Sequence, residues 1–162
     1  EGGQSWYEFS VDPLGRRAID PVQLAGVTGH TFMLIRKVAW LHIVDRRLLC
    51  VRSSGRSAFY VPGGKPEAGE DDHAALIREL DEELSVVIDR STITNAGQFS
   101  APADGKPDAI VEIEAFTAQY SGTLVPGGEI AEHRFLTSTE PAPVSAVTRA
   151  IMEHLRSADA ID

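Results

Sequence analysis

One amphipathic helix with clear boundary signals constrains the fold of this 162-residue chain more than any other segment. Residues 74–84 contain only amino acids that form or tolerate a helix, and Asp71 before them is a good N-cap. An apolar residue recurs at every fourth position, which places one apolar stripe along the helix. That stripe must pack on another element, and it consists of Leu76, Leu80 and Leu84.

Strand-like runs lie on both sides of this helix. Residues 38–44 are apolar and partly β-branched, residues 45–47 form a polar turn, and residues 48–52 return as a hairpin partner. Because strands and helices are mixed and do not alternate regularly, we expect an α/β (α+β) fold with a mixed sheet flanked by helices. Further strands are expected near residues 58–61, 86–88, 93–100, 109–120 and 129–136, and a last helix from Pro143 to Leu155.

The charge balance limits the partners of the chain. Fifteen basic residues stand against 24 acidic ones, so the net charge is −9. A chain with this charge is repelled by polyanions, which argues against binding of long DNA or RNA. Single nucleotides stay open as partners, provided that a metal ion or a local basic pocket receives their phosphates.

Cysteine content and hydropathy indicate the cellular compartment of the chain. Its single cysteine, Cys50, cannot form an intrachain disulfide, which fits a reducing compartment. No stretch is long and apolar enough for a membrane helix, and residues 1–4 do not resemble a signal peptide. We therefore expect a cytoplasmic protein without a membrane partner. Residues 1–30 are predicted to form a peripheral segment, which leaves a role in a homodimer contact open.

Three glutamates near the end of the predicted helix carry the chemistry. Glu79, Glu82 and Glu83 share one face, where each like-charged pair costs a few tenths of a kcal/mol. They also lie at the end of the helix where the dipole disfavours anions. A hard divalent cation would remove both penalties, since Mg²⁺ takes carboxylate oxygens. A solvated acidic face in an interaction protein is the alternative explanation of this run.

The run from Gly64 to Val86 resembles the signature of the Nudix hydrolases. That signature reads G-x5-E-x7-R-E-U-x-E-E-x-G-U, where U is a bulky aliphatic residue. One defined position departs from it, because Ser85 stands where the family has glycine. A serine in the left-handed conformation expected there would cost about 1–2 kcal/mol, so we expect a changed helix end or a modest loss of stability. The matching positions are Gly64, Glu70, Arg78, Glu79, Leu80, Glu82, Glu83 and Val86.

The resemblance implies a Nudix-like α/β/α sandwich over residues 31–158 and a metal-dependent nucleotide pyrophosphohydrolase. Mg²⁺ or Mn²⁺ would be held by the three glutamates and the Gly64 carbonyl, and would lower the pKa of the attacking water. Arg78 and Glu70 would hold the helix and its preceding loop in position. The general base is left open. Glu129 is the first choice, and the alternatives are Glu79, Glu112, Glu114 and Glu132.

The sequence restricts the identity of the substrate less than it restricts the type of reaction. The loop from Pro62 to Lys65 resembles that of MutT-type enzymes, which implies hydrolysis of nucleoside triphosphates, including oxidised ones such as 8-oxo-dGTP, to nucleoside monophosphate and pyrophosphate. Lys65 could then contact phosphate, while Phe59 and Tyr60 could stack on a base. Two alternatives stay open: a pyrophosphatase for ADP-ribose or nucleotide sugars, and a non-catalytic domain that senses a nucleotide.

Overall fold

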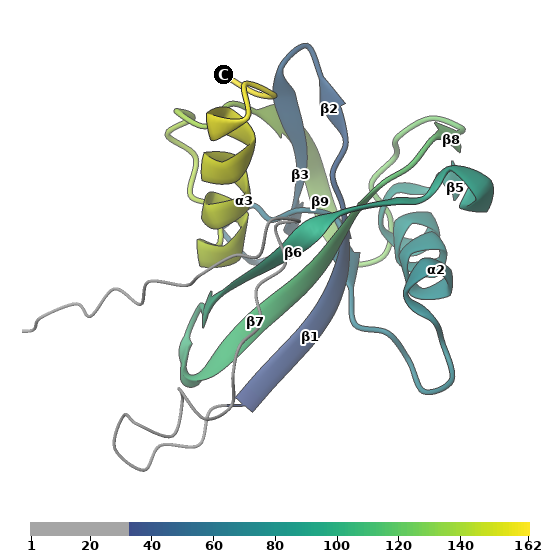
Figure 1. Ribbon diagram of the computed structural model, residues 1–162, viewed down its shortest axis with the longest axis horizontal. Helices are drawn as coiled ribbons and strands as arrows, with labels where there is room; N and C mark the ends of the chain where they lie inside the picture. Colours follow the sequence, from purple (N-terminus) through teal and green to yellow (C-terminus); the bar gives the residue numbers. More distant parts are fainter. Residues whose placement is uncertain (1–32) are drawn as a thin grey trace, which may run out of the picture. The chain divides into compact units, whose positions relative to one another are not determined.

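The computed structural model describes residues 33–162 (Figure 1). The predicted peripheral segment, residues 1–30, lies outside these described residues. In chain order the elements are β1 (Met33–Trp40), β2 (Ile43–Val44), β3 (Arg47–Ser53), β4 (Gly63–Gly64), α2 (Asp72–Leu84), β5 (Val87–Ile88), the 3₁₀ turn η1 (Arg90–Thr92), β6 (Thr94–Ala103), β7 (Lys106–Thr117), β8 (Tyr120–Ser121), β9 (Ile130–Leu136) and α3 (Ala146–Ser157).

The larger sheet is mixed, as the sequence predicts. Within residues 33–162, one four-stranded sheet has the order β4-β1-β7-β6, and a three-stranded sheet has the order β2-β3-β9. Strands β1 and β7 run parallel, whereas β4 pairs antiparallel with β1, and β6 with β7. The pairing of β1 with the two-residue strand β4 places Val38 opposite Gly64 and Ala39 opposite Gly63.

Helices α2 and α3 lie on opposite sides of the sheets (Figure 1). Two buried apolar clusters correspond to these layers. The leucine stripe of α2 packs with Val38, Trp40 and Leu49 in one cluster, and α3 contributes Ile151 and other residues to the second. The predicted α/β/α sandwich with a mixed sheet is therefore confirmed.

Two predicted strands differ from the structure. Residues 38–44 are not one strand, because the chain leaves β7 after Trp40 and pairs with β3 from Ile43 onward, so it passes from one sheet to the other. Residues 58–61 form no ladder either. Phe59 bridges Val144 and Tyr60 bridges Val51, so this segment makes single contacts with two different neighbours.

The helix boundaries follow local capping. Asp71 caps α2 as predicted, since its side chain accepts a hydrogen bond from the N–H of Ala74. The predicted start of the last helix at Pro143 is wrong. Its carbonyl accepts the N–H of Phe59 instead, and α3 begins only after Ser145, which is the N-cap. Within residues 33–162, no helix is both long and apolar enough to cross a membrane.

Candidate active site

The glutamates of α2 meet the two glycines of β4. Oε2 of Glu83 accepts a hydrogen bond from the N–H of Gly63 at 3.0 Å. Gly64 lies under the carboxylate of Glu79 so closely that a Cβ on Gly64 would be 2.4 Å from the carboxylate carbon. Glycine at this position leaves the Glu79 carboxylate in place, because any side chain would displace it. The Gly-Gly strand and two of the three glutamates predicted as metal ligands therefore form one site.

Among the site glutamates, Glu83 has the most strongly raised pKa. The side chain is buried, although α2 has no basic residue in its last turn. Burial raises the pKa of Glu83 to about 8, and the bond from Gly63 opposes this only partly. The charges of Glu79 and Glu129 contribute to this rise, while Lys37 opposes it. A buried carboxylate next to two others is a chemical setting in which a divalent cation would be stabilising.

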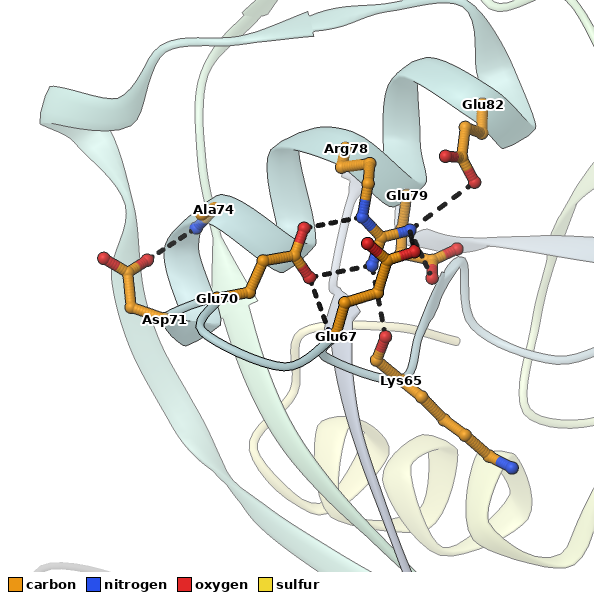
Figure 2. Close-up of polar contacts among 8 residues, drawn as sticks. All are labelled: Lys65, Glu67, Glu70, Asp71, Ala74, Arg78, Glu79 and Glu82. Atoms are coloured by element: carbon orange, nitrogen blue, oxygen red, sulfur yellow. Dashed lines mark hydrogen bonds and ion pairs between the residues drawn. The ribbon is translucent and has the colours of Figure 1, made fainter.

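Arg78 ties the helix to the preceding loop (Figure 2). Its Nε donates to Glu70 at 2.6 Å and its Nη2 to the other Glu70 oxygen at 2.9 Å, a two-pronged contact. Its Nη1 lies 3.0 Å from Oε1 of Glu79, and its Nη2 donates to the Lys65 carbonyl at 3.2 Å. The Arg78 guanidinium lowers the pKa of Glu70 to about 2, assisted by the N–H of Glu67.

Glu82 is placed differently from its two neighbours. Its side chain is 57% exposed, and its nearest cationic contact is Nη1 of Arg78 at 3.5 Å. Within residues 33–162, no three acidic, histidine or cysteine side chains are already grouped closely enough to hold a metal ion. The residues nevertheless fit Mg²⁺ or Mn²⁺ in kind, because hard carboxylate oxygens border the Gly64 cradle that no side chain fills.

The loop before β9 brings Glu129 to the site. The last carbonyls of α2 have no partner within the helix, and two of them accept N–H groups from this loop. The Leu84 carbonyl accepts the N–H of Val125, and the Glu83 carbonyl accepts that of Gly127, both at 2.9 Å. A Cβ on Gly127 would lie 2.8 Å from the Glu82 carbonyl, so this close approach also needs glycine.

The other base candidates lie elsewhere. Glu112 and Glu114 alternate along β7. The charges of both help to raise the pKa of Arg36, which pairs with Asp72 at 2.8 Å. Glu132 lies on β9 and pairs with Arg52 at 3.0 Å, which lowers its pKa. None of these three carboxylates is among the charges acting most strongly on Glu83, whereas Glu129 is.

The predicted substrate residues differ in accessibility. The Phe59 ring is 3% exposed and lies under the Arg134 guanidinium, so it offers little surface to a base. Tyr60 is half-buried. Burial is the main reason that its pKa rises to about 12, and the charges of the site glutamates also raise it. Lys65 is exposed, and its ammonium group points away from Arg78 in Figure 2.

Ser85 keeps the conformation that the family's glycine favours. It lies at the C-cap of α2 with φ 58° and ψ 33°, and its N–H donates to the Asp81 carbonyl. Its hydroxyl also donates to the Val125 carbonyl at 3.2 Å. The helix end is therefore not changed, and of the two expected outcomes a cost in stability stays a prediction.

Sequence reasoning missed Lys37. This half-buried lysine lies in β1, and the charges that act on it are those of Glu79, Glu83, Glu129 and Lys65. The signal was a lysine just before the apolar residues Val38 to Trp40 of the same strand, since a partly buried lysine is uncommon. Its relation to the glutamates depends on sheet pairing and could not be read from spacing.

The family model that describes the NUDIX domain matches residues 33–155 of this chain. The chain belongs to the NUDIX domain family. The resemblance inferred from residues 64–86 is thereby confirmed. Membership supports a hydrolase that acts on pyrophosphate bonds, and NUDIX proteins generally use a divalent metal ion and act on small nucleotide substrates. No protein with a curated description matches the chain.

Solved structures share this NUDIX fold. The MutT NUDIX hydrolase from Burkholderia pseudomallei matches with a TM-score of 0.61 and 22% identity, over 75% of this chain and 97% of that one. The ORF135 protein of E. coli matches with a TM-score of 0.59 and 23% identity, over 81% and 96%. A UDP-X diphosphatase matches with a TM-score of 0.55 and 16% identity, over 86% and 70%. At these identities the likeness concerns the fold alone.

Proposed function

We propose that this NUDIX chain is a divalent-metal-dependent nucleotide pyrophosphohydrolase, and that Glu79, Glu82, Glu83 and the Gly64 carbonyl hold Mg²⁺ or Mn²⁺. The observation that carries the proposal is the buried Glu83 carboxylate, whose pKa is raised to about 8 beside two further glutamates. Such a group is costly to keep ionised in a folded chain, and a divalent cation offsets that cost. Glu82 would join the set by turning its exposed side chain toward Gly64.

Different residues of the chain have different roles in the proposed reaction. When bound, the metal ion supplies charge neutralisation of the diphosphate and a more acidic water. Arg78 holds Glu79 and, through Glu70, the loop that carries Gly64. We assign the general base to Glu129. It would take a proton from water as the water oxygen bonds to phosphorus and the phosphorus–oxygen bond to the leaving group breaks.

For the substrate we propose a nucleoside triphosphate, including oxidised ones such as 8-oxo-dGTP, with nucleoside monophosphate and pyrophosphate as products. The loop from Pro62 to Lys65 supports this proposal, and so does the half-buried Tyr60, on whose pKa the charges of the site glutamates act. Long nucleic acid does not fit a net charge of −9. The lone, buried Cys50 is the ground for proposing a cytoplasmic location.

A substrate panel with product identification tests the proposal. The purified chain is incubated with Mg²⁺ and, separately, with dGTP, 8-oxo-dGTP, ADP-ribose and UDP-glucose, and the products are separated by chromatography. We expect nucleoside monophosphate and pyrophosphate from a triphosphate, and loss of turnover in Glu83→Gln. Turnover of ADP-ribose or UDP-glucose alone would replace the triphosphate proposal. Tight nucleotide binding without any product would favour a sensor domain instead.

A further inference from the structure

Lys37 lies next to the Gly-Gly strand but takes part in no ion pair within the described part of the chain. It occupies the middle of β1, and the following residue, Val38, is opposite Gly64. Among residues 33–162, no carboxylate oxygen lies within 4.0 Å of its ammonium nitrogen. A half-buried ammonium without a close partner is costly, so its position calls for an explanation.

The charges around Lys37 belong to the candidate active site. Burial lowers the pKa of Lys37, and the charge of Lys65 lowers it further. Glu83, Glu129 and Glu79 oppose this, in that order of strength. The charges of these carboxylates act on the ammonium group without an ion pair to any of them. Among the described residues its three N–H donors have no carboxylate partner, so they could serve another acceptor.

Metal binding would change this balance. A divalent cation on Glu79, Glu82 and Glu83 would offset part of the attraction that now favours the Lys37 ammonium, because it adds a like charge nearby. An anion with several oxygens would stabilise both cationic groups at once, because it can contact each of them. A diphosphate is such an anion, since one phosphate oxygen can face the metal ion while another accepts from the ammonium.

We infer that Lys37 donates a hydrogen bond to a phosphate oxygen of the bound diphosphate. This inference rests on the proposed function, because it places the diphosphate at the same site. Lys37 is then a substrate-binding residue contributed by the sheet, on a different element from the helix that carries the metal ligands. A purely structural lysine, which only balances the glutamates, would leave diphosphate binding unaffected.

Binding of inorganic pyrophosphate in the presence of Mg²⁺ tests the inference by calorimetry. Lys37→Met removes the ammonium and keeps most of the side-chain stem. We expect pyrophosphate to bind about 10- to 100-fold more weakly, the range for a hydrogen bond to a charged group. Lys37→Arg should bind more tightly than Lys37→Met, and Lys106→Met, at the exposed start of β7, should match the wild type.

A second measurement covers the case in which Lys37→Met does not fold. The chain has three lysines, Lys37, Lys65 and Lys106, so reductive methylation with ¹³C-formaldehyde gives few signals. Adding Mg²⁺ and pyrophosphate should shift the Lys37 signal and leave that of Lys106 in place. An unmoved Lys37 signal, or equal pyrophosphate affinity in wild type and Lys37→Met, would overturn the inference.

The substrate panel separates this inference from the proposed function. If the wild-type chain hydrolyses a nucleotide and Lys37→Met does so with unchanged kcat/KM, the Lys37 inference fails while the proposed function stands. If the wild-type chain hydrolyses nothing on the panel, the proposed function fails. Pyrophosphate binding by the Lys37 variants then still decides whether this lysine receives a phosphate.

Discussion

The N–H of Gly63 and the Oε2 atom of Glu83, twenty residues apart, are joined by a hydrogen bond of 3.0 Å. This bond crosses from the end of α2 to the edge strand β4 and holds one oxygen of a buried carboxylate. A single neutral N–H compensates only part of the cost of an ionised buried glutamate, as the raised pKa of Glu83 shows. The site is therefore electrostatically strained when no cation is bound.

Glu83→Gln should relieve this strain, and the free energy of unfolding without metal should show the difference. The folded pKa of about 8 lies above the ordinary value of 4.5, so the folded state keeps a proton that the unfolded state has lost. Stability without metal should therefore fall as pH rises from 4.5 to 8. In urea titrations with EDTA, the variant should exceed the wild type by on the order of 3 kcal/mol above pH 8 and converge with it below pH 4.5. Parallel pH profiles would contradict this.

Gly64→Ala should separate geometry from stability. The new Cβ would lie 2.4 Å from the carboxylate carbon of Glu79, so Glu79 must move. A displacement of about 1 Å in a catalytic group can cost about 100-fold in rate, and we expect a loss of that order in kcat. Gly55→Ala is the control. It has the strained φ of +75° but no atom within 4 Å, so activity should persist despite a small stability loss.

Arg78→Met should weaken the site more than the comparable change at Arg90. Arg78 has a 24% exposed side chain and contacts Glu70 and Glu79, whereas Arg90 is 52% exposed and, among residues 33–162, forms an ion pair only with Asp71. Loss of such a supporting contact typically lowers activity about 10- to 100-fold, and we expect this for Arg78→Met. Arg90→Met should stay near wild type. Equal kcat/KM losses in both variants would refute the orienting role.

The ion pair between Arg78 and Glu70 should also affect unfolding at acid pH. The pKa of Glu70 is lowered to about 2, so the stability that this carboxylate contributes is present above pH 4.5 and is lost as pH falls toward 2. Glu70→Gln removes this titration. Its stability should change less than that of the wild type between pH 4.5 and 2 when unfolding is followed by circular dichroism. A steeper loss in the variant would contradict the assignment.

Ser85 allows the cost of the family departure to be measured. Ser85→Ala and Ser85→Gly both remove the hydroxyl bond to Val125, but only alanine keeps a Cβ in the left-handed conformation. The glycine variant should therefore be more stable than the alanine variant by about 1 kcal/mol in urea titrations. The opposite order would mean that the helix end relaxes to another conformation.

Glu129→Gln tests the proposed base. A general base typically contributes about 100- to 10,000-fold to rate, so kcat should fall within that range. The thermal midpoint should still rise with Mg²⁺, because the α2 ligands are intact. Glu132→Gln, three positions further on, serves as the control and should keep most of the activity. A kcat for Glu129→Gln like that of the control would transfer the role to another group.

Local patterns were sufficient for much of this protein. The α2 helix, its Asp71 cap and the shared face of Glu79 and Glu83 follow from spacing, because helical geometry relates residues three or four positions apart. Hairpin β2–β3 and the mixed sheet class were also predictable. The family membership was predictable for the same reason, since its signature is confined to 23 consecutive positions of the printed chain, Gly64 to Val86.

Contacts between distant segments required the folded chain. Spacing could not show that 38–44 passes between two sheets, because apolar strand residues read alike in either sheet. Nor could it show that the carbonyls of α2 bind the loop before Glu129, or that β4 places Gly64 opposite Val38, the residue after Lys37. The metal-ligand face of α2 is a property of one helix, whereas the surroundings of Glu83 depend on three segments that meet only in the tertiary structure.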